Sequence, residues 1–406
     1  MEVRKITQEE YLEYRRLSSI CFNYPLEKDH VSWKDELDKH AKDWENRLGA
    51  FDENGNLIAA LYIIPFEMNF DGHTVKMGGI QAVVTAPEAR GSGVMNKVFN
   101  ECLRMMKEDG QIFSTLYPFS CAYYRKFGYE IAYMHKVIEI DIMPFTKYPF
   151  PKDSVRFWKK EEGLADIKAV YEEFRKGRNY AIKRNDWCWE RMMPKDEDPY
   201  VTKNYTYIHY DSGGKPDSYL RFQPDRRVGG EAVINIAELA WASLEGLYAM
   251  FGFIGGLRPQ LDKVVWRGMP MDLDIYSMIP EARDVKDITK GSSDTVMTRI
   301  VDLPAVLALL KPPSQAKGRV VIEVLDKSLP SNTGKYAISW ENGRLSVEKS
   351  SQNPDMSTTI EAMAQMLTGY LNSDMAAYRQ DTIINSQDEA LAALFSTKNL
   401  YMWERF

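Results

Sequence analysis

One stretch decides the fold of the N-terminal region: Val83-Val84-Thr85-Ala86-Pro87-Glu88-Ala89-Arg90-Gly91-Ser92-Gly93-Val94-Met95. It runs from an apolar strand through an Arg-Gly-Ser-Gly turn into a helix. The glycines let the backbone approach a ligand closely, because no Cβ stands in the way. The helix that follows offers unpaired N–H groups and the positive end of its dipole, which together bind phosphate. The stretch therefore predicts a strand–turn–helix unit that binds a phosphate group.

A second informative stretch is Tyr123-Tyr124-Arg125-Lys126-Phe127-Gly128-Tyr129, which follows another predicted strand. Together the two stretches resemble the acyl-coenzyme A site of the GNAT acetyltransferases. The resemblance implies an N-acetyltransferase that uses acetyl-coenzyme A as its cosubstrate. Such a transfer needs a bound thioester, a deprotonated amine and a proton donor for the leaving thiolate, and it needs no covalent intermediate.

The resemblance implies a role for each part of the two stretches. The pantetheine arm would pair with the backbone of the central strand at Val83, Val84 and Thr85. The pyrophosphate would lie against Arg90, Gly91, Ser92, Gly93, Val94 and Met95, although the family pattern has a small residue where this chain has Met95. Tyr124 would be the general acid, since a phenol of pKa ~10 can protonate a thiolate whose acid has a pKa of ~8–9. The alternatives are a plain surface turn and a pair of packing tyrosines.

Length and composition limit the class of protein. A chain of 406 residues predicts two or three domains, and 44% hydrophobic residues are enough for sizeable cores. The net charge of −6 argues against a nucleic-acid partner and favours a cationic or neutral substrate. No signal-peptide pattern and no run of eighteen apolar residues is present, so we predict a cytoplasmic protein without a membrane partner.

The cysteines and histidines show no metal-ligand spacing. The four cysteines are far apart and form no C-x-x-C pattern, and the five histidines are equally scattered. This usage predicts reduced thiols and neither a zinc site nor another metal site.

The predicted fold class is α+β, in three units. Residues 1–146 alternate helix and strand patterns around the glycine turn, which predicts a mixed sheet. In this unit Leu57–Ile64 is predicted as a strand that Pro65 ends. The proline-rich segment 144–151 breaks both helix and strand, so the first boundary is placed there.

Residues 147–296 are predicted to repeat the first unit in a degenerate form. The strand at 232–236 and the helix from about Ser243 resemble the strand–helix unit of the GNAT domain. The connection between them has no Arg-Gly-x-Gly and places the acidic Glu238 near the point where phosphate would lie. We predict a GNAT-like domain that no longer binds the coenzyme, with chance similarity as the alternative.

Residues 297–406 resemble a sterol-carrier-protein domain, on Ile322-Glu323-Val324-Leu325-Asp326 and Leu367-Thr368-Gly369. The order of the three units, with an aromatic end at Leu400-Tyr401-Met402-Trp403-Glu404-Arg405-Phe406, resembles the Eis (enhanced intracellular survival) acetyltransferases. That resemblance implies a homohexamer in which the α-carboxylate of Phe406 is the general base. It also implies an amine acceptor of the aminoglycoside, polyamine or lysine type. A tail that packs only on its own domain is the alternative.

Three residues are predicted at the mouth for the amine substrate: Phe22, Trp33 and Glu404. Two other functions are compatible with the sequence. One is a lipid or acyl-chain carrier that uses the C-terminal unit and has a vestigial GNAT domain. The other is a protein acetyltransferase that acts on one partner at the same site. An intact glycine turn beside Tyr124 speaks against the vestigial domain.

Overall fold

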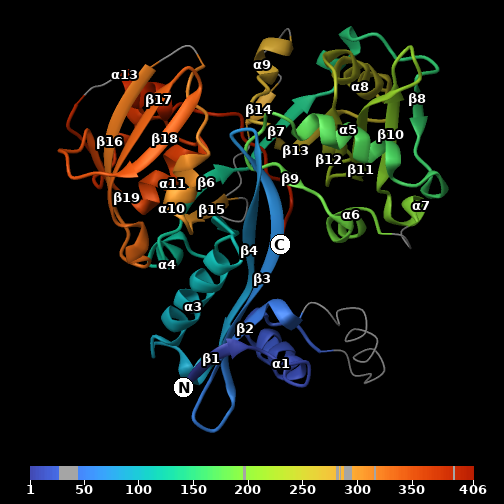
Figure 1. Ribbon diagram of the computed structural model, residues 1–406. Helices are drawn as coiled ribbons and strands as arrows, with labels where there is room; N and C mark the ends of the chain where they lie inside the picture. Colours follow the sequence, from blue (N-terminus) through green and yellow to red (C-terminus); the bar gives the residue numbers. More distant parts are fainter. Residues whose placement is uncertain are drawn as a thin grey trace.

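The computed structural model describes residues 1–26, 44–194, 198–279, 283, 285–287, 295–314, 317–386 and 389–406. The strands of these residues form three mixed sheets, which confirms the predicted α+β class. Figure 1 shows that the long hairpin of β3 (Leu57–Phe70) and β4 (His73–Thr85) rises from the N-terminal domain between the other two domains. Within the described ranges, no helix combines the length and the apolar character that a membrane crossing requires.

The first sheet has the order β1-β2-β3-β4-β5-β15-β6, and β9 pairs with β3. Its other strands are β1 (Glu2–Lys5), β2 (Arg47–Phe51), β5 (Phe113–Leu116), β6 (Glu130–Met134), β9 (Ile182–Lys183) and β15 (Thr295–Ile300). The associated helices are α1 (Tyr11–Phe22), α3 (Val94–Glu108) and α4 (Cys121–Arg125). Asp71 and Gly72 connect β3 to β4 with positive φ angles, as a tight two-residue hairpin requires.

The prediction that Pro65 ends a strand is wrong, because β3 continues through it and Pro65 pairs with Gly78 of β4. The reason lies in the other edge of β3. β2 pairs with β3 only as far as Tyr62, and β9 joins it again at Glu67. Pro65 therefore lies in a stretch where β3 has a single described neighbour, and a missing N–H on the other edge breaks no strand pairing.

The second sheet has the order β14-β7-β13-β12-β11-β10-β8. Its strands are β7 (Lys136–Asp141), β8 (Val155–Phe157), β10 (Tyr205–Tyr210), β11 (Pro216–Arg226), β12 (Ala232–Trp241), β13 (Lys263–Met269) and β14 (Val285–Asp287). α5 (Ala165–Arg175), α6 (Asp186–Met192) and α8 (Leu244–Gly256) accompany it. β12 is followed by α8 and pairs in parallel with β13, just as β4 is followed by α3 and pairs in parallel with β5.

The first two sheets exchange strands along the chain. β7, which the predicted first unit contains, pairs with β13 and β14 of the second sheet. β15 spans the predicted boundary at residue 296, yet it lies between β5 and β6 of the first sheet. The boundaries themselves stay a prediction.

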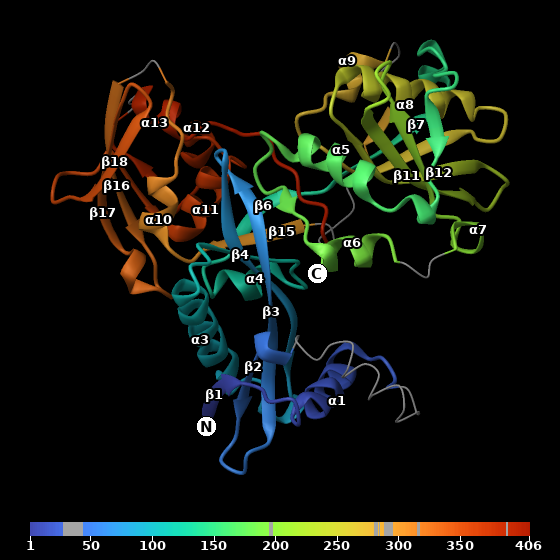
Figure 2. The same cartoon turned by 45° about the vertical axis from the view of Figure 1, so that its right-hand side comes forward.

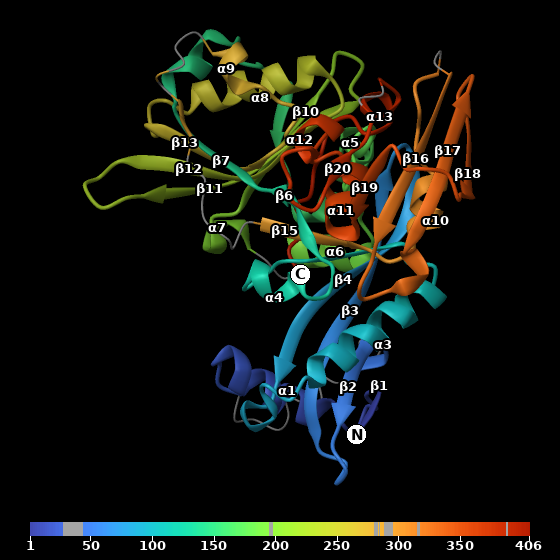
Figure 3. The same cartoon turned by 90° about the vertical axis from the view of Figure 1, so that its left-hand side faces the viewer.

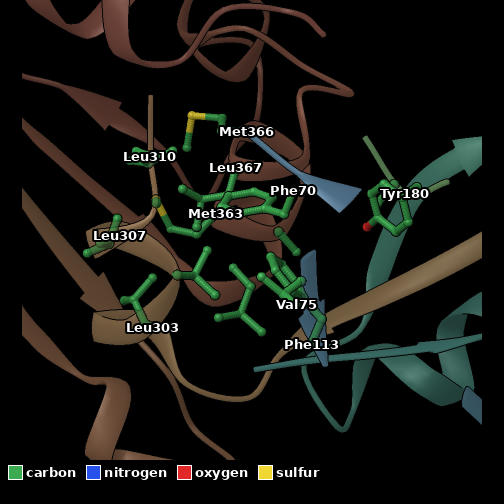
Figure 4. Close-up of a cluster of buried hydrophobic side chains, with 14 of the residues drawn as sticks. Phe70, Val75, Phe113, Tyr180, Leu303, Leu307, Leu310, Met363, Met366 and Leu367 are labelled. Atoms are coloured by element: carbon green, nitrogen blue, oxygen red, sulfur yellow. The ribbon is translucent and has the colours of Figure 1, made fainter. Parts of the chain in front are cut away.

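The third sheet, with the order β18-β17-β16-β19-β20, belongs to the C-terminal domain. Its strands are β16 (Lys317–Leu325), β17 (Gly334–Glu341), β18 (Arg344–Lys349), β19 (Met356–Thr359) and β20 (Ile383–Ile384). α10 (Leu303–Ala308) and α11 (Ile360–Thr368) pack beside the hairpin tip of β3 and β4. Figure 4 shows Phe70, Val75 and Phe113 of the first domain among Leu303, Leu307, Met363 and Leu367 of the third. The two domains therefore share one hydrophobic core.

Candidate active site

A bulge in β4 opens the first sheet at the site. Ala60 of β3 pairs with Val84, whereas Tyr62 pairs with Gln81, so β4 carries one extra residue there. The backbone accommodates the extra residue at Ala82, whose φ angle is 50°. The parallel pairing of β4 with β5 ends at Ile80 and Leu116. Among the described residues, Val83–Thr85 therefore has no strand on the β5 side, and this edge is available for a strand-like ligand.

The glycine turn follows this open edge directly. Gly91 and Gly93 have φ angles of 81° and 79°, which other residues rarely adopt, and Arg90 to Gly93 are exposed. The Ser92 hydroxyl donates to the Ala89 carbonyl at 2.7 Å, which closes the turn. α3 then begins at Val94 with Gly93 as N-cap, and the Ser92 hydroxyl accepts a hydrogen bond from the Val94 N–H at 3.4 Å. An N-terminus of this kind can bind an anion through its backbone.

The side chain of Met95 is buried with that of Val94 in the core beneath the turn, beside Val98 and Phe99. This orientation explains how the turn can hold Met95 where the family pattern has a small residue. Met95 directs its bulk into the core, so only its backbone remains for a ligand at the turn.

A pocket of about 490 Å³ lies beside the bulge, between α1, β4, α4 and the end of the chain. Its walls are mostly aromatic, from Tyr11, Tyr14, Phe22, Tyr24, Tyr62, Tyr117, Phe119, Tyr124 and Phe406. Figure 3 shows the C-terminus close to α6, far along the sequence from the strands around it. The fold thus brings together Tyr124 and Phe406, the two residues predicted as acid and base.

Tyr124 is held in place by α4 and by neighbouring rings. Ser120 caps α4 by accepting a hydrogen bond from the Tyr123 N–H at 3.3 Å. The ring of Tyr124 lies edge-on to Phe99 and Phe119, with centroids 6.1 and 5.3 Å away. Only 3% of Tyr124 is exposed. This burial raises the pKa of the phenol above its usual value, so the phenol stays protonated at neutral pH.

Phe406 packs its ring onto the backbone of β4. A Cβ on Gly79 would lie 2.9 Å from that ring, so only glycine leaves room there. Phe66 and Tyr117 flank the ring, with centroids 5.0 and 5.5 Å away. These contacts place Phe406 at the wall of the pocket, 9% exposed.

Tyr117 and His135 are two residues near the site that sequence reasoning missed. The Tyr117 hydroxyl donates to the Glu404 carbonyl at 2.8 Å and lies 3.1 Å from Nε2 of the buried His135. This arrangement fits an imidazole whose Nε2–H donates to the phenol oxygen. No motif in the sequence marks either residue. Tyr117 follows β5 and His135 follows β6, so their contact forms only when these strands come together in the sheet.

Arg47 is a further pocket residue that sequence reasoning missed. It comes from β2, and its guanidinium lies 4.0 Å from the ring centre of Tyr62 and about 5 Å from those of Tyr11 and Tyr14. Cation–π contacts of this kind hold an arginine against aromatic faces when it is desolvated. Arg15 of α1 also lines the pocket.

The other predicted site residues are placed differently. Val83 lines the pocket, Val84 is buried, and Thr85 is partly buried at the end of β4. Phe22 lines the pocket and is 54% exposed. Trp33 lies outside the described residues. Glu404 does not line this pocket, because its carboxylate faces Arg184 and Tyr171 on the other side of the tail. In the described part of the chain, no group of His, Cys, Asp and Glu is arranged to hold a metal ion.

Comparison with known families matches all three domains. Models of acetyltransferase (GNAT) domains match residues 2–132 and 181–300, and a sterol carrier protein domain model matches residues 303–403. The chain belongs to the GNAT N-acetyltransferases. An uncharacterized N-acetyltransferase of Streptomyces coelicolor is 26% identical to this acetyltransferase over 320 residues, which are 73% of this chain and 72% of the relative.

Solved structures share the fold of the acetyltransferase from end to end. A GCN5-related N-acetyltransferase from Anabaena variabilis superposes with a TM-score of 0.84 at 22% identity, and both chains are covered completely. Eis1 from Mycobacterium abscessus gives 0.81 at 21% identity, again with complete coverage of both chains. At these identities the likeness concerns the fold.

In the second GNAT domain, α8 corresponds to α3 of the first. The carboxylate of Asp217 lies beside the start of α8. The Ser243 hydroxyl, which caps α8, donates to Asp217 Oδ2 at 2.8 Å. Asp217 Oδ1 lies 2.5 Å from Nδ1 of His209 and would be 2.7 Å from a Cβ on Gly246. An aspartate thus fills the space beside the start of α8, and the degenerate character of this domain stays a prediction.

Proposed function

We propose that the protein transfers an acetyl group from acetyl-coenzyme A directly to an amine of the aminoglycoside, polyamine or lysine type. The observation that carries the proposal is the pocket that Tyr124 and Phe406 line together, at the bulge of β4. The family membership supports the reaction class. The homohexamer and the cytoplasmic location stay predictions.

The coenzyme would enter along the open edge of β4. Its pantetheine arm would hydrogen-bond to the backbone of Val83–Thr85, in place of the missing strand. Its pyrophosphate would lie on backbone N–H groups of the turn and of the start of α3, near the Arg90 guanidinium. The left-handed glycines support this role, since a Cβ on Gly91 would meet no other residue and the turn is open to solvent.

The transfer itself would need two proton movements. The amine nitrogen attacks the thioester carbonyl, a C–N bond forms, and the C–S bond breaks. The Phe406 carboxylate would take the proton that the nitrogen loses, and the Tyr124 phenol would protonate the leaving thiolate. Burial of Tyr124 supports this assignment, because the raised pKa keeps its proton available over the whole range in which amines begin to deprotonate.

An assay of thiol release from acetyl-coenzyme A, with a panel of amines, tests this function. We expect release that depends on the amine for at least one of three classes: aminoglycosides, polyamines and lysine peptides. A parallel thermal-shift scan with acetyl-coenzyme A and fatty acids checks the alternative. Stabilisation by fatty acids alone, without thiol release for any amine, would contradict the proposal and favour a lipid carrier.

Arg90→Glu should weaken the binding of acetyl-coenzyme A about 10- to 100-fold, because a charge-assisted hydrogen bond of about 1.5–3 kcal/mol to phosphate is replaced by repulsion. Titration calorimetry measures the dissociation constant. Arg104→Glu is the matched control, since it makes the same charge change at the far end of α3 among surface ion pairs. An unaltered dissociation constant for Arg90→Glu would remove the turn from the coenzyme site.

A further inference from the structure

We propose that the second domain positions the end of the chain in the active site, and that Arg184 and Glu404 are the positioning residues. This inference rests on the proposed role of the Phe406 carboxylate. It assigns the second GNAT domain a task in the reaction of the first one. Figure 2 shows the C-terminal segment running from the third domain along the second one to the neighbourhood of α6.

The backbone of the C-terminal segment is first fixed next to α5. The Asn179 N–H donates to the Asn399 carbonyl at 2.8 Å, and the Tyr401 N–H donates to the Asn179 carbonyl at 3.0 Å. Asn179 and Leu400 form a short parallel bridge. Leu400, Tyr401 and Met402 are buried. Tyr401 packs in the core of the second domain, whereas Leu400 and Met402 pack in the core that the first and third domains share, so the segment is fixed on both sides before it reaches the pocket.

Arg184 is the centre of the next anchor. Its Nε lies 2.5 Å from Glu404 Oε1, and its Nη2 lies 2.5 Å from Glu238 Oε1. Both partners and the arginine have side chains at most 9% exposed. The Tyr401 hydroxyl also donates to Glu238, at 3.0 Å. A buried charge needs such partners, so the carboxylate of Glu404 is strongly held at this position.

Burial alone would raise the pKa of Glu238, but the Arg184 guanidinium outweighs this effect and holds the pKa below its usual value. Glu238 lies inside β12, where it pairs with Arg221 of β11, so the prediction that it belongs to the connection before the helix is wrong. From this strand the Glu238 carboxylate fixes Arg184, which in turn fixes the tail.

Glu404 bridges the two GNAT domains. Its side chain is held by Arg184 of the second domain, and its carbonyl accepts the hydrogen bond from Tyr117 of the first. Glycines on both sides make room for the aromatic neighbours of Glu404. The ring of Trp403 lies on Gly268, where a Cβ would be 2.2 Å away, and the ring of Phe406 lies on Gly79.

The short distance along the chain makes this bridge effective. Only Arg405 separates Glu404 from Phe406, so a shift of Glu404 is passed on to the terminal carboxylate. A misplacement of about 1 Å in a catalytic group can reduce the rate about 10²-fold. Glu404 thus acts through Phe406 and does not itself touch the reacting atoms.

Glu404→Gln tests the proposal, because it removes the charge and keeps the shape of the side chain. We expect kcat at pH 7 to fall about 10- to 100-fold, with the KM for acetyl-coenzyme A within about twofold. The deficit should shrink as the pH approaches 10, because the free amine then needs less help from a base. Glu139→Gln is the matched control, since Glu139 is a similarly buried, ion-paired glutamate of the second domain away from the tail.

The same substitution in a chain extended beyond Phe406 shows which of the two proposals is wrong if a result is unexpected. In a chain extended beyond Phe406, Glu404→Gln should cause no further loss of the residual turnover, because two changes that act through one group are not additive. The same loss in both backgrounds, or a loss no larger than that of Glu139→Gln, would overturn the positioning role. Normal turnover of Glu404→Gln would overturn it as well. Normal turnover of the extended chain alone would instead refute the proposed base.

Discussion

A chain extended by a few residues beyond Phe406 should lose about 10²- to 10⁴-fold in turnover while it stays folded. The extension converts the terminal carboxylate into a neutral amide, and a general base contributes a factor of this size. The added residues must also pass the rings of Phe66 and Tyr117, which flank Phe406. The measurements are kcat with the best amine of the panel and Tm from thermal denaturation.

The same residues added before Met1 provide the matched control, because Met1 is exposed and does not line the pocket. This control should keep full turnover. Gly79→Ala should also lower turnover without any change of chain length, since its Cβ would press on the rings of Phe66 and Phe406. Full activity of the chain extended at its C-terminal end would rule out the terminal carboxylate as base.

Tyr124→Phe should lower kcat about 10²-fold or more and change the dissociation constant of acetyl-coenzyme A little. The substitution removes the only proton that Tyr124 can give to the leaving thiolate, and it leaves the ring to pack against Phe99 and Phe119. Because burial raises the pKa of this phenol, the wild-type rate should show no loss from its ionisation up to about pH 10.

Tyr123→Phe is the control for this prediction. Tyr123 is the neighbouring tyrosine of α4, it is only partly buried, and it does not line the pocket. Its loss should change kcat by no more than about threefold. Equal rates for Tyr124→Phe and the wild type would show that another group protonates the thiolate.

The buried ion-pair anchor shows why part of the site escaped prediction. Arg184 and Glu404 are 220 residues apart along the chain, and each alone has the pattern of an ordinary surface charge. Glu404 was predicted at the amine mouth on resemblance, whereas its carboxylate is engaged by Arg184. Charged side chains carry no periodic signal, so their partners depend on how whole domains pack.

Local chemistry determined the features that the sequence could predict by itself. Residues 83–95 dictate a strand, a left-handed glycine turn and a helix, because φ angles near 80° at Gly91 and Gly93 need residues without a Cβ. The apolar faces of α3 and β4, and the tyrosine of α4, follow from short-range patterns in the same way. These features specify the GNAT class and the turn that we propose for the coenzyme.

Only the tertiary structure decided how the chain completes this unit. The exchange of β7 and β15 between the sheets, the passage of β3 through Pro65 and the meeting of Tyr117 with His135 depend on edges that are free or covered in the assembled sheets. Phe406 and Tyr124 line one pocket only in the folded chain, in which residues 399–404 contact Asn179 and Arg184. Such contacts form between distant segments, where burial and charge pairing in three dimensions outweigh any local preference.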